Sequence, residues 1–363
     1  EDTVYKLTDG CVIVVGYGDP YGGHRGITLE AGKDPNFTAS MRDGYLGILP
    51  DIEIKLQDPN AADQDDNGVY QLSSVKQFIW FANAINNGEI DQASNAVLTD
   101  DIDLTGESFS PIGTADVPYK GVFDGAGKHI TGLSLEASGA WTNTGLFANV
   151  KTGTVKNLTV SGTVSTAVYS KSQGRDTIYP YTGGIVGYLD SGTVTNCVSN
   201  VNVTGQKSEY VGGVVGGTYY AKEISDCINN GTVTGNTAGG VVGHMKGTLK
   251  NCTNNGAVSS ASKYAGGIAA VVKPTADISG CTNNGTVTLE ASSTSSMYVG
   301  GIIAYIEKPV STFGLVNTIT GCTNTGALLV NNKAEDSRNY PHIGGIIGYV
   351  ELANYNQRLL VQN

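Results

Sequence analysis

Apolar residues in the C-terminal half of the chain come in short runs that follow a Gly-Gly pair, with polar residues between the runs. The steps between successive pairs are 29, 27, 27, 34 and 44 residues, and the pairs begin at Gly183, Gly212, Gly239, Gly266, Gly300 and Gly344. A period in this range is typical of stacked architectures, because one unit cannot bury its own apolar face. A 27-residue step suits one coil with three short strands and three corners. The pattern therefore predicts an all-β chain that forms a parallel β-helix over residues 120–363.

The N-terminal third shows no such repeat and divides into two parts. Residues 1–57 carry strand-like runs broken by Gly, Pro and Asp, which predicts an irregular β segment. Residues 58–119 hold an acidic loop, one helix and the first strands. In the helix, Ser74 and Gln77 are spaced for a capping box and Gly88 suits the C-terminal end. Its apolar stripe consists of Val75, Phe78, Ile79, Phe81, Ala82 and Ile85. We predict that this helix caps the open end of the stack, whose strand edge would otherwise be unpaired.

One position in each repeat is apolar and is a cysteine in five of the six repeats. Its occupants are Leu158, Cys197, Cys227, Cys252, Cys281 and Cys322. Because leucine is accepted there, the position is expected to face the interior, where free cysteine behaves as a small hydrophobic residue. Neighbouring coils about 4.8 Å apart would also satisfy the Cα separation of a disulfide, but the side chains would point in parallel. We predict a ladder of reduced, buried thiols, with disulfides as the alternative; Cys11 lies outside the repeat.

The residue before this position predicts a sharp bend. Only Asn, Asp or Gly occurs there, at Asn157, Asn196, Asp226, Asn251, Gly280 and Gly321. These three residue types tolerate a left-handed backbone conformation. In a straight strand Val194 and Cys197 would face opposite sides, whereas a bend at Asn196 lets both point inward.

A second polar column and a set of variable loops complete the repeat. Asn200, Asn230, Asn255 and Asn284 lie three residues after the cysteine position, where stacked amides can hydrogen-bond from coil to coil. The Asn-Gly pairs in this region would otherwise indicate hairpins. The extra residues of the long repeats gather at 164–180, 289–297 and 331–342, just before the Gly-Gly pairs, with a further insert near 307–316. Loops gathered at one corner would build a rim, where repeat proteins often bind their ligands.

Charge and composition narrow the classes of partner. The chain has 33 acidic and 22 basic residues among 363, a net charge of −11, and 50 glycines. This balance disfavours nucleic acid and anionic membranes, which need a basic surface. No run of 18 apolar residues occurs, so no transmembrane segment is expected.

The repeat resembles the GLUG repeat of bacterial surface proteins. The tetrads that carry the resemblance are Gly184-Ile-Val-Gly187, Gly213-Val-Val-Gly216, Gly240-Val-Val-Gly243 and Gly345-Ile-Ile-Gly348. Strands such as Gly192-Thr-Val-Thr-Asn-Cys197 follow them, and the stretch at 98–127 is similar to the lead-in of such repeats. Two repeats depart from the tetrad, with Ala269-Ala270 and with Ala304. The resemblance covers residues 70–363 and implies a right-handed β-helix.

The resemblance also implies a setting and a function. It suggests an exported, adhesin-like protein of the Bacteroides type at the bacterial cell surface, with a lipid anchor on a removed leader as one mode of attachment. We expect a non-enzymatic adhesin or binding protein whose rim contacts host or microbial glycans or surface proteins. The alternatives are a polysaccharide lyase or glycoside hydrolase on the same fold, and a passive spacer. The family brings no catalytic residues to this sequence.

Two groups of side chains are candidate binding sites. Asp63, Asp65 and Asn67, followed by Gly68, match the first part of a calcium loop, although Ser74 replaces the glutamate expected at the twelfth position. The alternative is a solvated acidic turn, and no other cofactor is expected. The second group lies two residues before each Gly-Gly pair and consists of Tyr181, Tyr210, Thr237, Tyr264, Tyr298 and His342. Tyrosine suits sugar rings and protein partners, and the alternative is a ladder that only shields a corner.

Catalytic chemistry has weaker support in the sequence. β-Helix enzymes that cleave acidic polysaccharides need clustered carboxylates, but Asp190, Glu223, Asp226 and Glu307 fall at different repeat positions. The four histidines are scattered, and His244 shares its repeat position with tyrosines. We therefore assign no catalytic residue.

Overall fold

The computed structural model describes most of the chain from residue 60 onward and two short strands before it. The described residues are 3–6, 12–15, 60–137, 143–166, 171–173, 176–178, 180–205, 210–291, 297–308, 316–332, 341–351 and 358–362. The chain divides into two compact units, Glu1–Ala61 and Ala62–Asn363. In the first unit, β1 (Thr3–Lys6) and β2 (Val12–Val15) pair antiparallel. The strand-like run at 52–56 and Cys11 lie outside the described residues.

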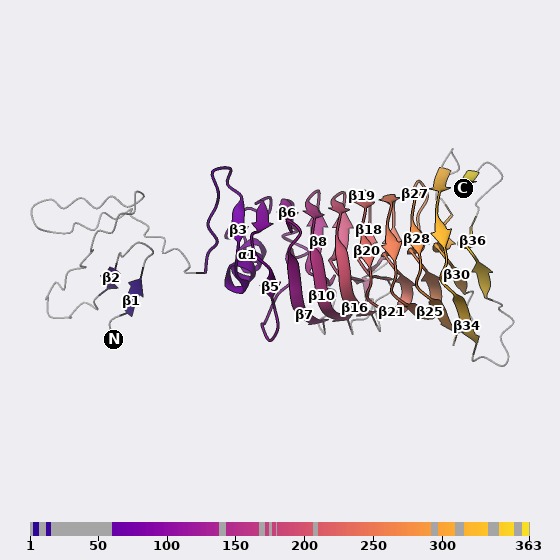
Figure 1. Cartoon of the computed structure of the whole chain (residues 1–363), viewed down its shortest axis with the longest axis horizontal. Coiled ribbons are helices and arrows are strands. Elements are labelled where there is room, and N and C mark those ends of the chain that lie inside the picture. The colour runs from indigo at the N-terminus through magenta and orange to yellow at the C-terminus, as the bar shows by residue number, and fades with distance from the viewer. Residues whose placement is uncertain are drawn as a thin grey trace, which may run out of the picture. The chain divides into compact units, whose positions relative to one another are not determined.

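The second unit is a parallel β-helix, which confirms the predicted fold class. Its strands lie side by side along one axis, each coil paired with the next (Figure 1). Sheet 1 has ten strands: β3 (Tyr70–Leu72), β4 (Ala96–Leu98), β6 (Val122–Asp124), β9 (Thr154–Lys156), β15 (Thr193–Thr195), β19 (Ala221–Ser225), β23 (Gly247–Lys250), β27 (Asp277–Ser279), β32 (Val316–Thr320) and β37 (Arg358–Gln362). Sheet 2 has seven: β8 (Phe147–Lys151), β14 (Val186–Asp190), β18 (Val215–Thr218), β22 (Val242–Met245), β26 (Ala269–Val272), β31 (Ile303–Ile306) and β36 (Ile347–Val350).

Sheet 3 is the largest and carries both the strand after each bend and the strand before each Gly-Gly pair. The strands after the bends, with the first strands of the stack, are β5 (Ile102–Asp103), β7 (His129–Ala137), β10 (Thr159–Thr166), β16 (Val198–Gly205), β20 (Ile228–Asn229), β21 (Val233–Gly239), β24 (Thr253–Asn254), β25 (Val258–Gly266), β28 (Thr282–Asn283), β29 (Val287–Ala291), β33 (Thr323–Asn324) and β34 (Leu328–Asn332). The separate strands before Gly-Gly pairs are β13 (Tyr181–Gly183), β17 (Tyr210–Gly212), β30 (Tyr298–Gly300) and β35 (His342–Gly344). A small hairpin of β11 (Lys171–Gln173) and β12 (Asp176–Ile178) lies apart from these sheets.

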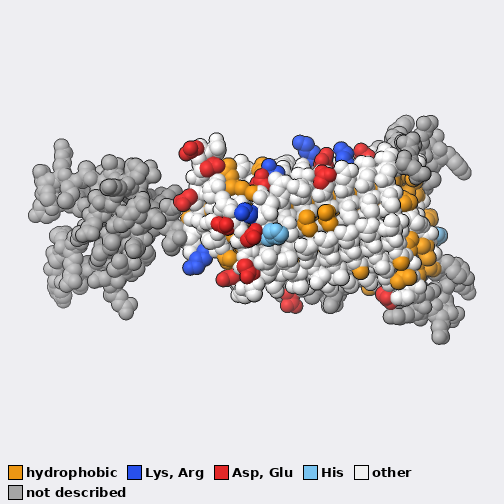
Figure 2. All heavy atoms as spheres, in the orientation of Figure 1, with side chains coloured by type: hydrophobic (Ala, Val, Ile, Leu, Met, Phe, Trp, Pro, Cys, Tyr) orange, Lys and Arg blue, Asp and Glu red, His pale blue; other side chains and the backbone are white. Residues whose placement is uncertain are grey.

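Helix α1 (Val75–Asn87) lies at the N-terminal end of the stack (Figure 1). Ser74 accepts a hydrogen bond from the Gln77 amide, as predicted, while the Gln77 side chain accepts from the Ser73 amide instead of the cap residue. Gly88, with φ of 71°, ends the helix. The buried face of α1 belongs to the same apolar core as the first coils, so the helix covers the interior at this end. At the C-terminal end, hydrophobic side chains gather at the surface instead (Figure 2). Leu329 in β34, Ile343 in β35 and Val361 in β37 are exposed.

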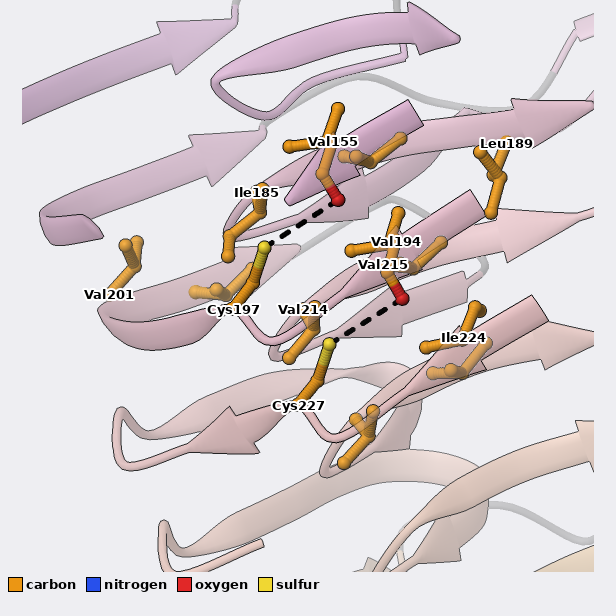
Figure 3. Close-up of a cluster of buried hydrophobic side chains, with 14 of the residues drawn as sticks. Val155, Ile185, Leu189, Val194, Cys197, Val201, Val214, Val215, Ile224 and Cys227 are labelled. Atoms are coloured by element: carbon orange, nitrogen blue, oxygen red, sulfur yellow. Dashed lines mark hydrogen bonds between the residues drawn. The ribbon is translucent and has the colours of Figure 1, made fainter. Parts of the chain in front are cut away.

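The core runs along the axis as columns of equivalent residues. In sheet 1, Val155, Val194 and Ile224 pair in register and are fully buried, and Figure 3 shows them beside Cys197 and Cys227. The predicted bends are confirmed. Asn196 has φ of 51°, and the equivalent residues Asn157, Asp226, Asn251, Gly280 and Gly321 have values between 52° and 62°. The bend turns the chain from sheet 1 into sheet 3 and lets the cysteine point inward.

Two asparagine ladders join the coils. The outer ladder was predicted: the Asn230, Asn255 and Asn284 amides each donate to the preceding asparagine at 2.8–2.9 Å, beginning at Asn200. The inner ladder was not predicted. It consists of Asn229, Asn254, Asn283 and Asn324, one residue earlier, each linked to the next at 2.7–2.8 Å. Asn229, Asn254 and Asn283 are fully buried, so amides replace apolar side chains in part of the core.

The inner ladder explains the second glycine of four of the six Gly-Gly pairs. A Cβ atom on Gly240 would overlap the carbonyl of Gly267 and the Asn254 side chain. The same close approach joins Gly213 to Asn229 and Gly267 to Asn283. In these pairs the missing side chain of the second glycine makes room for an inner asparagine.

Candidate functional site

The predicted tyrosines form one edge of the coil together with a second aromatic column. Strand pairing aligns Tyr181 with Tyr210, Tyr264 with Tyr298, and Tyr298 with His342. Across the Gly-Gly corner, sheet 2 aligns Tyr188 with Gly217, Gly217 with His244, and Tyr305 with Tyr349. We call the combined set the aromatic ridge: Tyr181, Tyr188, Tyr210, His244, Tyr264, Tyr298, Tyr305, His342 and Tyr349.

The rings of the two columns interleave into two stacks. In the first stack, the centre of the Tyr181 ring lies 5.1 Å from that of Tyr188 and 5.5 Å from that of Tyr210, and the Tyr210 and His244 ring centres are 4.6 Å apart. In the second, Tyr298 lies 5.5 Å from Tyr264, 5.3 Å from Tyr305 and 4.6 Å from Tyr349. Thr237 stands between Tyr210 and Tyr264 in the first column and separates the stacks. The faces of many ridge rings are therefore occupied by other rings, which leaves their edges for outside contacts.

Gly217 shows how the ridge is packed. It occupies the repeat position of Tyr188 and His244, and a Cβ atom there would overlap the Tyr181 ring. The missing side chain leaves room for Tyr181 to lie over the next coil. The ridge is thus held by packing along the axis as well as by strand pairing.

Ion pairs follow the ridge along the ends of the sheet 2 strands. Lys151 pairs with Asp190 at 3.8 Å, Lys273 with Glu307 at 3.0 Å, and Lys308 with Glu351 at 3.1 Å. The Tyr305 hydroxyl donates to Glu351. Burial, followed by the hydrogen bond to Glu351 and the charge of that carboxylate, raises the pKa of Tyr305, so this phenol stays neutral and can donate.

His244 is the one ridge residue with a strongly lowered pKa. The residue is only 5% exposed, and burial, followed by the charge of Lys273, lowers its pKa to about 3. The Glu307 carboxylate is 4.0 Å from Nε2, too far for a hydrogen bond, and is paired with Lys273. His244 is therefore neutral near pH 7 and acts as an aromatic member of the stack.

The most exposed aromatic side chains beside the ridge were not singled out from the sequence. Tyr219 and Tyr220 are 54% and 47% exposed, and their rings meet edge to face at 4.5 Å. The Lys246 ammonium lies 3.8 Å from the Tyr220 ring centre. Strand pairing aligns Leu189 with Thr218 and Thr193 with Glu223. The corner between Thr218 and Glu223, which holds the tyrosine pair, is therefore one residue longer than the corner between Leu189 and Thr193 in the preceding coil. The Tyr-Tyr doublet at a lengthened corner is the signal that could have identified the pair.

The cysteine positions lie inside the coil. Cys197, Cys227, Cys252 and Cys281 are free and buried, Cys322 is free and half-buried, and Leu158 is buried in the same position. Each thiol lies 3.1–3.5 Å from the carbonyl two residues earlier, as in Cys227 to Ser225. The interaction with Cys227, followed by burial, raises the pKa of Cys197. These positions belong to the core, and the four buried thiols are shielded from reagents in solution.

The acidic loop forms a tight turn. One Asp65 carboxylate oxygen accepts hydrogen bonds from the amides of Asn67 and Val69, both at 2.9 Å. Within the described part of the chain, no three His, Cys, Asp or Glu side chains form a group that could hold a metal ion. Calcium binding by Asp63, Asp65 and Asn67 remains a prediction.

The four carboxylates considered for catalysis lie in separate contacts. Asp190 pairs with Lys151, Glu223 with Lys250 at 3.5 Å, and Glu307 with Lys273. Asp226 accepts from the Asn251 amide of the next coil at 3.2 Å. Their contacts tie neighbouring coils together.

No helix among the described residues is long and apolar enough to cross a membrane.

Comparisons with known proteins agree with this architecture. The family model "The GLUG motif" matches residues 179–204. Halomucin from Haloquadratum walsbyi is 27% identical over 246 residues, which are 58% of this chain and 2% of that protein. The crystal structure of a "putative immunoglobulin A1 protease" from Bacteroides ovatus aligns with a TM-score of 0.58 and 22% identity, over 80% of this chain and 86% of that one. At this identity the likeness shows the fold alone. The chain thus carries a GLUG motif at residues 179–204, and its repeats build a parallel β-helix.

Proposed function

We propose that this chain is a non-enzymatic binding protein of the cell surface, and that glycan or protein ligands contact the aromatic ridge together with Tyr219 and Tyr220. The observation that carries the proposal is the exposure of this tyrosine pair beside the stacked ridge. Tyrosine is enriched at binding surfaces, because its ring offers apolar area and its hydroxyl offers a hydrogen bond.

The geometry of the ridge suits an extended ligand. Its first column runs through six coils, from Tyr181 to His342, and five steps of about 4.8 Å give a length of roughly 24 Å. The stacked rings are already ordered, so binding would cost little side-chain entropy. A surface setting is supported by the GLUG motif and by the similarity to halomucin, which covers only 2% of that protein. Attachment to a bacterial surface, by a lipid anchor or otherwise, belongs to the same proposal.

Binding to glycan arrays and to whole cells tests this proposal. Replacing both Tyr219 and Tyr220 by Ala should weaken binding by about 30-fold, as expected for central aromatic contacts worth about 2 kcal/mol. Tyr210→Ala and Tyr298→Ala test the ridge itself. Val122→Ala, at another exposed apolar residue, is the control and should leave binding unchanged.

Two results would contradict the proposal. Unchanged binding in all three tyrosine variants would show that the ligand contacts another surface, and no binding by the parent protein would favour a passive spacer. New reducing or unsaturated ends after incubation with acidic polysaccharides would instead favour a lyase or hydrolase on this fold.

A further inference from the structure

A cleft of about 720 Å³ opens near the N-terminal end of the stack, and its lining does not include Tyr219 or Tyr220. It lies between the last turns of α1, the 107–115 segment, the end of β7 and the start of sheet 2. Its volume falls in the range of roughly 300–1,000 Å³ that is usual for small-molecule sites. Its lining includes Asn83, Asn87, Glu107, Phe109, Ser134 and Glu136.

The walls of the cleft are held by a chain of amide hydrogen bonds. Asn86 accepts from the Gly113 amide at 2.8 Å and donates to the Pro111 carbonyl at 2.9 Å, which fastens α1 to the 107–115 segment. Asn149 donates to the Gly113 carbonyl at 3.2 Å, and Asn143 donates to Asn149 at 2.7 Å. The wall is thus tied to both the helix and the first strand of sheet 2. Because its walls are already held in place, the cleft loses little conformational entropy when a ligand binds.

The lining combines one aromatic ring with amide, hydroxyl and carboxylate groups. Phe109 is half-buried and stacks on Phe78 at 5.3 Å, so its position is set by the core. Asn83 and Asn87 are exposed on the last turns of α1. Side-chain amides both donate and accept hydrogen bonds, whereas the Glu107 and Glu136 carboxylates accept only. This mixture complements a ligand with many hydroxyl groups and an apolar C–H face.

The negative charge of the lining favours uncharged sugars over anionic ones. Among the described residues that line the cleft, Glu107 and Glu136 are charged and none is Lys, Arg or His. Like charges would repel a uronic acid or a sulfated sugar. We therefore propose that the cleft binds a short, uncharged oligosaccharide, in a site separate from the exposed tyrosine pair.

Calorimetry on the full chain tests this second site. The probes are maltohexaose, cellohexaose, xylohexaose, mannohexaose and chitohexaose, with hexagalacturonate and a hyaluronan hexasaccharide as the anionic counterparts. We expect at least one neutral probe to bind and both anionic probes to give no binding. Ser134→Trp, at an exposed position of β7, should fill the cleft and abolish binding. Asn83→Ala should weaken it by about 2- to 10-fold through the loss of one hydrogen bond.

Matched controls separate this site from the exposed tyrosine pair and from a general loss of structure. Asp116→Asn removes a carboxylate at an exposed position next to the 107–115 segment, outside the lining, and should leave affinity unchanged. The double variant Tyr219→Ala and Tyr220→Ala should also bind the neutral probe normally. The inference is overturned if no neutral probe binds at millimolar concentration, if an anionic probe binds more tightly than the neutral ones, or if a folded Ser134→Trp variant retains full affinity.

Discussion

The buried asparagine ladder gives the sharpest prediction, because an exposed ladder one residue away provides its own control. Asn254 is fully buried and makes three side-chain hydrogen bonds. It donates to the Asn283 amide oxygen at 2.8 Å and to the Gly256 carbonyl at 2.9 Å, and it accepts from Asn229 at 2.8 Å. Asn255 is exposed and makes two such bonds, to Asn230 and from Asn284.

The two alanine substitutions should differ strongly in their effect on the free energy of unfolding. In Asn254→Ala, three hydrogen bonds of about 1 kcal/mol each are lost, and buried partners at Asn283 and Gly256 are left unsatisfied. We expect a cost of about 3–6 kcal/mol. In Asn255→Ala, water can replace both lost partners, and the cost should stay below about 1 kcal/mol.

Urea unfolding followed by circular dichroism measures both variants. Amide hydrogen exchange in the coil around residues 252–256 should be read alongside, since a stacked protein can open locally before it unfolds as a whole. The reasoning would be refuted if Asn254→Ala and Asn255→Ala lowered the free energy of unfolding equally, or if Asn255→Ala lowered it more. Burial would then not explain the contribution of the inner ladder to stability.

The remaining predictions concern packing, thiol reactivity, pH and metal. Gly240→Ala should destabilise the protein by about 1–3 kcal/mol or more in a melting experiment, because its Cβ overlaps the Gly267 carbonyl and the Asn254 side chain. At most two of the six cysteines should react with a thiol reagent in the native protein, since four described thiols are buried, and all six should react in denaturant. Because folding lowers the His244 pKa from 6.5 to about 3, the unfolded state binds the extra proton first. The free energy of unfolding should therefore fall as the pH drops from 6.5 to about 3, by at most about 1.4 kcal/mol per pH unit. His244→Gln should remove this contribution to the pH dependence of stability, and His129→Gln should not. Calcium should raise the melting temperature if the acidic loop at 63–68 binds it, and an unchanged value would reject that site.

Much of the fold could be predicted from the sequence, because it depends on residue types that recur at fixed positions. Leucine at position 158 identified the cysteine position as apolar, and the Asn, Asp or Gly before it identified the bend, which the φ of 51° at Asn196 confirms. Ser74, Gln77 and Gly88 marked the ends of α1, although the Gln77 side chain bonds to the Ser73 amide instead of the Ser74 amide. Signals of this kind are local and do not require knowledge of the contacts between coils.

The candidate sites were less accessible, because they depend on what lies beside each residue in the neighbouring coils. The sequence aligned Tyr181 with Tyr210, but only the packed structure shows that Tyr188 stacks on Tyr181 across the corner and occupies ring surface. It likewise could not rank Asn254 above Asn255, whose burial differs completely. The cleft joins α1, the 107–115 segment and sheet 2, which share no repeat pattern.

The sequence by itself determined the coil, its bends and its interior positions, since these follow from backbone preference and apolar periodicity. The tertiary structure alone decided which polar side chains are buried, which rings face each other and where a cleft opens, since these depend on distances between residues far apart in the chain.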